Sequence, residues 1–231
     1  MPISVERARR QHAEYQRALA ALGCEVIELP EEPACPDSVF VEDTAVVFDE
    51  CAVLARPGAE SRRAETASVR AVLARYRRLH VIEAPATLDG GDVLRVGRRV
   101  FVGLSTRTNA EASEQLSELL QAPGYEVVPV SVEGCLHLKS AVSVVAHDLI
   151  VVHPDAVDPN VFGMSYVAVP LATANMLLVN GTVLCPAVAR AAARQLERVG
   201  LRVQLIDNSE LARAEGGLTC CSLILGKKPA G

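Results

Sequence analysis

The stretch GGDVLRVGRRVFVGLSTRTNAEASEQLSELLQAPGYEVVPVSV, residues 90–132, decides the fold. Residues 90–97 and 98–105 are two short runs rich in β-branched and apolar residues, which predict a hairpin. Residues 108–120 repeat apolar side chains at helical spacing, and residues 126–132 predict another strand. The order along the chain is therefore strand, strand, helix, strand.

The same order returns on both sides of this stretch. Asn180 and Gly181 mark one of the additional hairpins, because this pair favours a tight two-residue turn. The expected strands are 36–48 (a pair or a bulged strand), 51–56, 80–85, 136–146, 149–154, 166–170, 174–181, 182–186 and 203–207. Helices are expected at 4–22, about 60–78 and 187–200, with a weaker helical link before residue 166.

Two further strands are expected near the chain ends, at residues 24–30 and 218–225. Pairing between the two ends would complete a first module, so the sequence predicts five ββαβ modules around a centre. The fold class is then α/β, a five-bladed ββαβ propeller in one domain over residues 1–231. A doubly wound sheet is the alternative, but it expects one strand per helix and a glycine-rich phosphate loop.

Composition narrows the classes of partner. The formal charge of −5 argues against a nucleic-acid or anionic-membrane partner and is compatible with a small cationic ligand. No apolar run reaches the roughly 18 residues of a membrane span, and the first residues lack the apolar segment of a signal peptide. Seven scattered cysteines without metal-site spacing fit free thiols in a reducing compartment, so a cytoplasmic protein is expected.

Four polar clusters fall at module starts or strand ends, where sites are usually built. Carboxylates this dense are a solvated turn or a socket for a cation, and arginines lie on a wet helix face or bind a carboxylate through their planar fork. A lone histidine in a strand is more often structural than catalytic. The clusters are PDSVFVED with Asp37, Glu42 and Asp43; Arg62 and Arg63 with Arg107; LDGGD with Asp89 and Asp92; and LHLKS with His137.

A fifth stretch, EGGLTCCSL at residues 215–223, holds two adjacent cysteines. In the strand expected here, successive side chains point to opposite faces, so one thiol at most looks into a given cavity. Most free cysteines are small buried hydrophobes. A cysteine close to a histidine differs, because the histidine can hold the thiolate or shuttle a proton.

Taken in order, PDSVFVEDTAVV, RPGAESRRAE, LDGGDVL, FVGLSTRTNAE, LHLKS and GGLTCCS resemble the dimethylarginine dimethylaminohydrolase family of the pentein, or guanidine-modifying, superfamily. The resemblance covers nearly the whole chain, and the motifs together are specific although each alone is weak. It implies the five-bladed propeller and the hydrolysis of Nω-methylated arginines to citrulline and a methylamine. It implies no metal, nucleotide or organic cofactor.

The resemblance also assigns residues. Cys220 matches the nucleophile, His137 the general acid and base, and Asp89 the acidic residue that orients the histidine. The remaining matches are to the substrate: Asp43 with Glu42 for the guanidinium, Arg62 and Arg107 for the α-carboxylate, Asp37 for the α-amino group, and the backbone of Ala214 beside Glu215 for the guanidinium end.

Two departures from the family accompany the match. The family has a strand and a mobile loop before the first helix, which are expected to be missing here through a misassigned start or a genuine shortening. Glu215 stands where the family usually has Asp. Two alternatives therefore stay open: another guanidine hydrolase such as an arginine deiminase, and a non-catalytic propeller that binds arginine derivatives or a protein. An open sheet edge would also allow a homodimer.

Overall fold

The computed structural model describes residues 2–226, and the chain divides into two compact units. The first unit joins residues 1–28 to Lys139–Cys221, and the second joins Leu29–Leu138 to Ser222–Gly231. Each unit contains two three-stranded sheets. No helix in the described part of the chain is both long and apolar enough to cross a membrane.

All four sheets follow one plan. The first two strands pair antiparallel, the chain then crosses over, and the third strand pairs parallel to the second. In the second unit the strands are β1 (Ala45–Val47), β2 (Cys51–Leu54) and β3 (Arg78–Val81), then β4 (Val93–Val96), β5 (Arg99–Leu104) and β6 (Glu126–Ser131). In the first unit they are β7 (Val142–Ala146), β8 (Leu149–Val152) and β9 (Ser165–Ala168), then β10 (Leu177–Val179), β11 (Thr182–Pro186) and β12 (Arg202–Ile206).

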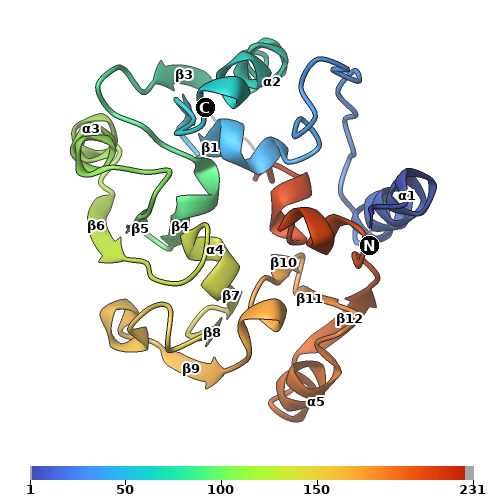
Figure 1. The fold of residues 1–231 in the computed structure, drawn as a ribbon. Helices are drawn as coiled ribbons and strands as arrows, with labels where there is room; N and C mark the ends of the chain where they lie inside the picture. Colours follow the sequence, from blue (N-terminus) through green and yellow to red (C-terminus); the bar gives the residue numbers. More distant parts are fainter. Residues whose placement is uncertain (1, 227–231) are drawn as a thin grey trace. The chain divides into compact units, whose positions relative to one another are not determined.

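Helices form three of the four crossovers, as Figure 1 shows within each unit. They are α2 (Thr66–Leu73), α3 (Ala110–Gln121) and α5 (Arg190–Arg198), while the 3-10 helix η4 (Pro159–Phe162) replaces a helix between β8 and β9. Asn109 caps α3, because its side chain accepts the N–H of Ala112. The predicted order of strand, strand, helix, strand is confirmed, with this weaker link in the third module.

The core of the second unit lies under the crossover helices. Val53, Val100 and Val102 of the central strands and Leu116 of α3 are fully buried and pack in one apolar cluster. The middle strands are apolar on both faces because helices and neighbouring loops cover them, as in parallel sheets generally.

The first unit starts with helix α1 (Val5–Ala21), close to the predicted limits of 4–22. Ser4 caps it by accepting the N–H of Arg7, and Tyr15 and Leu19 lie on its buried face. Glu210, which is 2% exposed, accepts the backbone N–H of Ser4 and pairs with Arg7. Glu210 therefore holds the start of α1 against the segment that leads to Glu215.

Both predicted terminal strands are wrong. Residues 24–30 form no strand, and their hydrophobic side chains Val26 and Ile27 are exposed, so no sheet partner or core holds them. Residues 218–225 contain only the 3-10 helix η7 (Thr219–Cys221). Here the backbone N–H of Thr219 donates to a side chain, Asn175, instead of to a strand ladder.

Candidate active site

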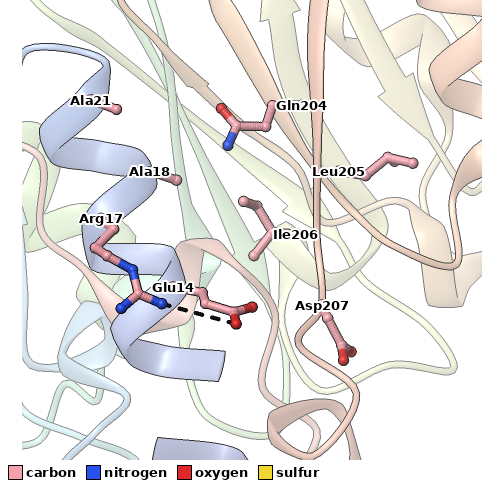
Figure 2. A pocket seen from close by; sticks show the side chains of 8 residues that line it. All are labelled: Glu14, Arg17, Ala18, Ala21, Gln204, Leu205, Ile206 and Asp207. Carbon is pink, nitrogen blue, oxygen red and sulfur yellow. Dashed lines mark ion pairs between the residues drawn. The ribbon is translucent and has the colours of Figure 1, made fainter. Parts of the chain in front are cut away.

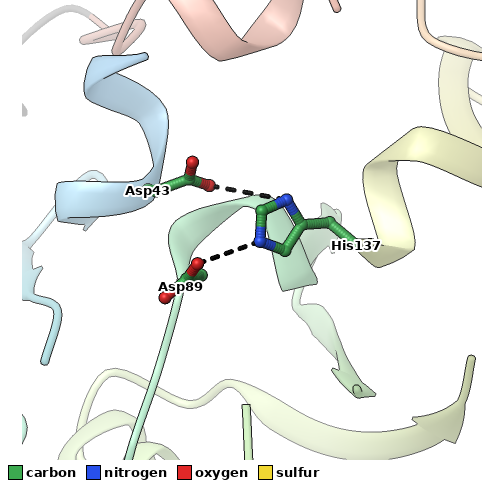
Figure 3. Close-up of side chains that lie close together, drawn as sticks. All are labelled: Asp43, Asp89 and His137. Atoms are coloured by element: carbon green, nitrogen blue, oxygen red, sulfur yellow. Dashed lines mark hydrogen bonds and ion pairs between the residues drawn. The ribbon is translucent and has the colours of Figure 1, made fainter. Parts of the chain in front are cut away.

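A buried acid–histidine cluster lies in the second unit, formed by Asp43, Asp89 and His137 (Figure 3). Asp43 lies on the 3-10 helix η1 (Val41–Thr44), and Asp89 immediately precedes the 3-10 helix η3 (Gly90–Asp92). His137 was predicted in a strand, but it lies in a bend just before the one-turn helix α4 (Leu138–Ala141). The leucines on either side of it imitate the alternation of a strand.

Asp89 holds the imidazole ring of His137 and is itself held. One carboxylate oxygen lies 3.0 Å from His137 Nε2, and the other accepts the backbone N–H of Gly58 at 2.9 Å. The backbone N–H of Asp89 donates to Thr108 Oγ1 at 3.1 Å. Since a carboxylate only accepts, Nε2 carries the proton of this bond, and Nδ1 is left as the nitrogen that can exchange a proton.

Asp43 faces that free nitrogen. Its Oδ1 lies 3.8 Å from His137 Nδ1 and accepts the backbone N–H of Gly91 at 3.0 Å. Burial lowers the pKa of His137, but the hydrogen bond with Asp89 and the charges of Asp43, Asp92 and Asp89 outweigh burial, so the pKa lies above its ordinary value. The three side chains offer donor atoms within 4.8 Å of one another, a spacing that would also accept a metal ion.

Arg62 fills the other side of Asp43. Its Nη1 donates to Asp43 Oδ2 at 2.6 Å, and its Nη2 and Nε donate to Glu65 at 2.7 and 3.0 Å. The same guanidinium also donates to the backbone carbonyls of Asp37 and Phe40. Burial lowers the pKa of Arg62, but the hydrogen bonds and charges of Glu65 and Asp43 raise it by more. The pKa of Arg62 therefore lies above its ordinary value, and Arg62 stays charged.

Arg107, the second predicted carboxylate partner, differs from Arg62. It lies half-buried in the turn after β5, and within residues 2–226 its guanidinium has no hydrogen-bond or ion-pair partner. Its backbone N–H donates to Ser105 Oγ at 3.0 Å. Asp37 is exposed, whereas Glu42 is 6% exposed and lies beside Asp43 on η1.

Asp92 was quoted in the LDGGD motif without a role, and in the structure it bonds to the backbone of Leu138, the residue after His137. It is fully buried, and one oxygen accepts the backbone N–H of Leu138 at 2.8 Å while the other accepts the Ser105 hydroxyl at 2.7 Å. Burial raises the pKa of Asp92, although His137 and these hydrogen bonds oppose the shift. Asp92 therefore connects the backbone after His137 to the turn that carries Arg107.

Cys135 lies two residues before His137 in the sequence. Its Sγ donates to the His137 carbonyl at 3.4 Å, and burial together with the charge of Asp92 raises its pKa to about 11. It stays protonated at neutral pH and is unsuited to act as a nucleophile or a metal ligand.

The first unit contains Cys220, Ala214 and Glu215. Cys220 Sγ accepts the backbone N–H of Gly217 at 3.2 Å, whereas Cys221 Sγ lies 4.0 Å from the Gly217 carbonyl and packs against an apolar cluster. An N–H donor stabilises a thiolate, and a carbonyl stabilises a protonated thiol. The two thiols therefore have different hydrogen-bond partners, the N–H of Gly217 for Cys220 and its carbonyl for Cys221. The prediction that they would differ by pointing to opposite faces of a strand is wrong, because no strand forms here.

Glu215 has a left-handed backbone, with φ of 61°. A non-glycine residue in this region is uncommon and is often found at functional sites. It ends the 3-10 helix η6 (Leu211–Ala214), and both Ala214 and Glu215 are exposed.

A separate hollow of about 340 Å³ lies between α1 and β12 in the first unit (Figure 2). Ala18 and Ile206 form part of its lining, and the ion pair of Arg17 with Glu14 lies at its edge. None of the predicted site residues lines it. Its ionisable lining residues are Glu14, Arg17 and Asp207, and it contains neither a cysteine nor a histidine.

Comparison with known proteins agrees with the motifs. The family model described as "N,N dimethylarginine dimethylhydrolase, eukaryotic" matches residues 2–175. A dimethylarginine dimethylaminohydrolase of Streptomyces coelicolor is 40% identical over 221 residues, which are 94% of this chain and 86% of the relative. One from Pseudomonas aeruginosa is 35% identical over 94% of this chain and 88% of the relative.

A solved structure extends the match to three dimensions. A cysteine-to-serine mutant of the Pseudomonas aeruginosa enzyme, complexed with citrulline, is 33% identical, with a TM-score of 0.91 over 96% of this chain and 89% of that one. Sequence, family model and fold agree over most of the chain's length. This chain belongs to the dimethylarginine dimethylaminohydrolase family.

Proposed function

We propose that this protein hydrolyses Nω-methylated arginines, asymmetric dimethylarginine and monomethylarginine, to citrulline and dimethylamine or methylamine. The observation that carries the proposal is the buried cluster of carboxylates around His137. The buried acidic residues of the second unit outnumber its buried basic residues, which are Arg62, Arg77 and His137; the acidic ones are Glu42, Asp43, Glu65, Asp89 and Asp92. Such an excess of acceptors in a low-dielectric site suits a guanidinium cation.

The substrate's guanidinium would bind Asp43, helped by Glu42 and by the backbone of Ala214 beside Glu215. Its α-amino group would meet Asp37, and its α-carboxylate would meet Arg107 and Arg62. Arg107 is suited to this role because, within residues 2–226, its hydrogen bond is made by its backbone and its guanidinium has no partner. Arg62 would have to release one of its bonds to the carbonyls of Asp37 and Phe40.

The proposed chemistry is covalent. The Cys220 thiolate attacks the guanidinium carbon and forms a tetrahedral adduct, and His137 gives a proton to the departing dimethylamine. The S-alkylthiouronium that remains is attacked by water, whose proton His137 takes. Collapse of this second adduct releases citrulline and restores the Cys220 thiolate. Asp89 would keep Nδ1 of His137 in the state that exchanges protons.

The finer architecture is part of the same proposal. The four three-stranded modules would be blades of a five-bladed pentein propeller in a single domain, and both chain ends would contribute the remaining blade without the two predicted terminal strands. A homodimer is also proposed. Analytical ultracentrifugation at micromolar protein would decide between a monomer near 24.6 kDa and a dimer.

Citrulline release is the direct test. The purified protein is given asymmetric dimethylarginine, monomethylarginine or unmodified arginine in separate reactions, and release from the methylated substrates alone is expected. Release from arginine alone would identify an arginine deiminase. Binding of dimethylarginine without turnover would indicate a non-catalytic binding protein.

Two neighbouring variants test the nucleophile. Cys220→Ser should abolish turnover, because a serine hydroxyl is a far weaker nucleophile than a thiolate at neutral pH. Cys221→Ser is the matched control and should keep most of the activity, since its sulfur faces a carbonyl. Equal losses in both variants would contradict the assignment.

A further inference from the structure

Asn175, which sequence analysis did not single out, contacts the turn that carries Cys220. It lies between β9 and β10, and all its hydrogen bonds are within the first unit. Its Oδ1 accepts the backbone N–H of Thr219 at 3.0 Å, and its Nδ2 donates to Thr219 Oγ1 at 2.9 Å. The same Nδ2 donates to the carbonyl of Lys139 at 2.9 Å. One primary amide therefore binds both the backbone N–H and the hydroxyl of Thr219, the residue before Cys220.

Gly217 shows how closely the turn lies against this amide. A Cβ atom added to Gly217 would overlap Cγ and Oδ1 of Asn175, so any larger residue there would displace the Asn175 amide. The backbone N–H of Gly217 is the group that donates to Cys220 Sγ. The Asn175 side chain thus limits where the sulfur's hydrogen-bond donor can lie.

Ser143 of β7 fixes the backbone on either side of Asn175. Its hydroxyl donates to the Ala174 carbonyl and accepts the N–H of Met176, both at 2.8 Å. Ser143, Ala174 and Met176 are all buried. Asn175 therefore projects from a rigid base, and its position is not set by the turn that it holds.

We propose that Asn175 is a positioning residue that holds the Gly217–Cys221 turn, so that the Gly217 N–H stays bonded to Cys220 Sγ. The bonds require two donors and one acceptor on one planar group, which an asparagine amide supplies and a carboxylate does not. The consequence for turnover rests on the proposed function. The consequence for the reactivity of the Cys220 thiol does not.

The test measures that reactivity directly. In a Cys221→Ser background, the tryptic peptide that follows Arg213 contains Cys220 as its one cysteine. Its alkylation by iodoacetamide is followed by mass spectrometry from pH 5 to pH 10. The variants are Asn175→Asp, which keeps the size of the side chain but loses both donated bonds, and Thr219→Val, which keeps shape but loses the hydroxyl. Asn160→Asp, at an exposed asparagine of η4, is the matched control.

Asn175→Asp should shift the midpoint of Cys220 alkylation upward by about one pH unit, because it adds a negative charge and frees the turn. Thr219→Val should shift it in the same direction by less, and Asn160→Asp should leave it unchanged. With dimethylarginine as substrate, kcat should fall by about 100-fold in Asn175→Asp while KM changes by less than about threefold, because positioning errors act on the reacting atoms.

Alkylation profiles that superimpose in the parent, Asn175→Asp and Thr219→Val proteins would overturn the inference, whatever the turnover. An inactive parent with shifted profiles would instead contradict the proposed function and leave the inference standing. Circular dichroism at each pH checks that the variants are folded. If Asn175→Asp does not fold, Thr219→Val decides alone.

Discussion

His137 and Asp89 share a hydrogen bond of 3.0 Å, so the protonation of one depends on the charge of the other. The folded-state pKa of His137 is raised above its ordinary value of 6.5. The protonated pair therefore stabilises the folded chain fully below pH 6.5, and this contribution is lost as pH rises through the raised pKa. The acid step of the proposed reaction needs the same protonated state.

We expect Asp89→Asn to move the alkaline limb of the kcat profile to lower pH. The substitution removes a charge that raises the pKa of His137, so the histidine loses its proton earlier as pH rises. Rates between pH 5 and pH 10 for the parent and the variant provide the measurement. Arg95→Gln, which breaks an exposed pair with Asp49, is the control and should leave the limb in place. An unmoved limb in Asp89→Asn would mean that another group supplies the proton.

Arg62 and Arg63 are neighbours in the sequence with different surroundings. Arg62 is buried between Asp43 and Glu65, whereas Arg63 pairs with the exposed Glu60. Removing a charge from a buried network leaves its partners uncompensated, while a surface pair contributes little.

Arg62→Gln should lower the free energy of unfolding by about 3–5 kcal/mol, the usual cost of breaking a buried ion pair. Arg63→Gln should change it by less than about 1 kcal/mol. Urea unfolding of both variants gives the comparison. Similar small losses in the two proteins would show that the Arg62 network adds no net stability.

At the level of elements, the LDGGD turn sets the spacing of the site. Gly90 packs against η1, where an added Cβ would overlap the carbonyl oxygen of Glu42. Gly91 faces the site instead, where a Cβ would lie 2.7 Å from Asp43 Oδ1 and 2.8 Å from His137 Nδ1. Adjacent glycines therefore serve different purposes, one in packing and one in leaving room between two site residues.

We predict that Gly90→Ala and Gly91→Ala separate stability from activity. Gly90→Ala forces backbone apart and should cost about 3 kcal/mol of stability. Gly91→Ala pushes side chains apart and should lower kcat by about 100-fold with a smaller loss of stability. Thermal unfolding and citrulline release are measured on both. Gly134→Ala, at a positive φ with open space, gives the cost of backbone strain without a clash, a strain that Gly90 and Gly91 do not carry. Loss of activity in proportion to stability in both variants would contradict this division.

For the whole molecule, substrate binding and stability are linked, because a ligand that binds only the folded chain stabilises it. In the Cys220→Ser protein, dimethylarginine at 100 times its Kd should add about 2.7 kcal/mol. For a chain of this length, that corresponds to a rise in Tm of about 5–10 °C. The same concentration should give a clearly smaller rise when Arg107→Ala is added, since the carboxylate loses its partner. Equal shifts would place the carboxylate elsewhere.

The sequence predicted the repeated modules because their signals are local. Period-two runs such as residues 98–105 and helical spacing in residues 108–120 act between neighbours along the chain, and both are confirmed as β5 and α3. The two terminal strands were predicted wrongly because strand formation also depends on a partner that is distant along the chain. Residues 24–30 and 218–225 have strand composition, but a strand exists only where another strand accepts its hydrogen bonds.

The candidate site divides in the same way. The sequence by itself determined the family and the site residues to consider, because the motifs around Asp43, Asp89 and His137 are each short and contiguous. Only the tertiary structure decided that Asp89 holds the imidazole, that Arg62 is bonded to Asp43, and that Asp92 accepts the backbone N–H of Leu138. The doublet of Gly216 and Gly217 signalled a close approach, yet not that Asn175 makes it. Hydrogen bonds between residues tens of positions apart depend on distances in space, and spacing along the chain contains no record of them.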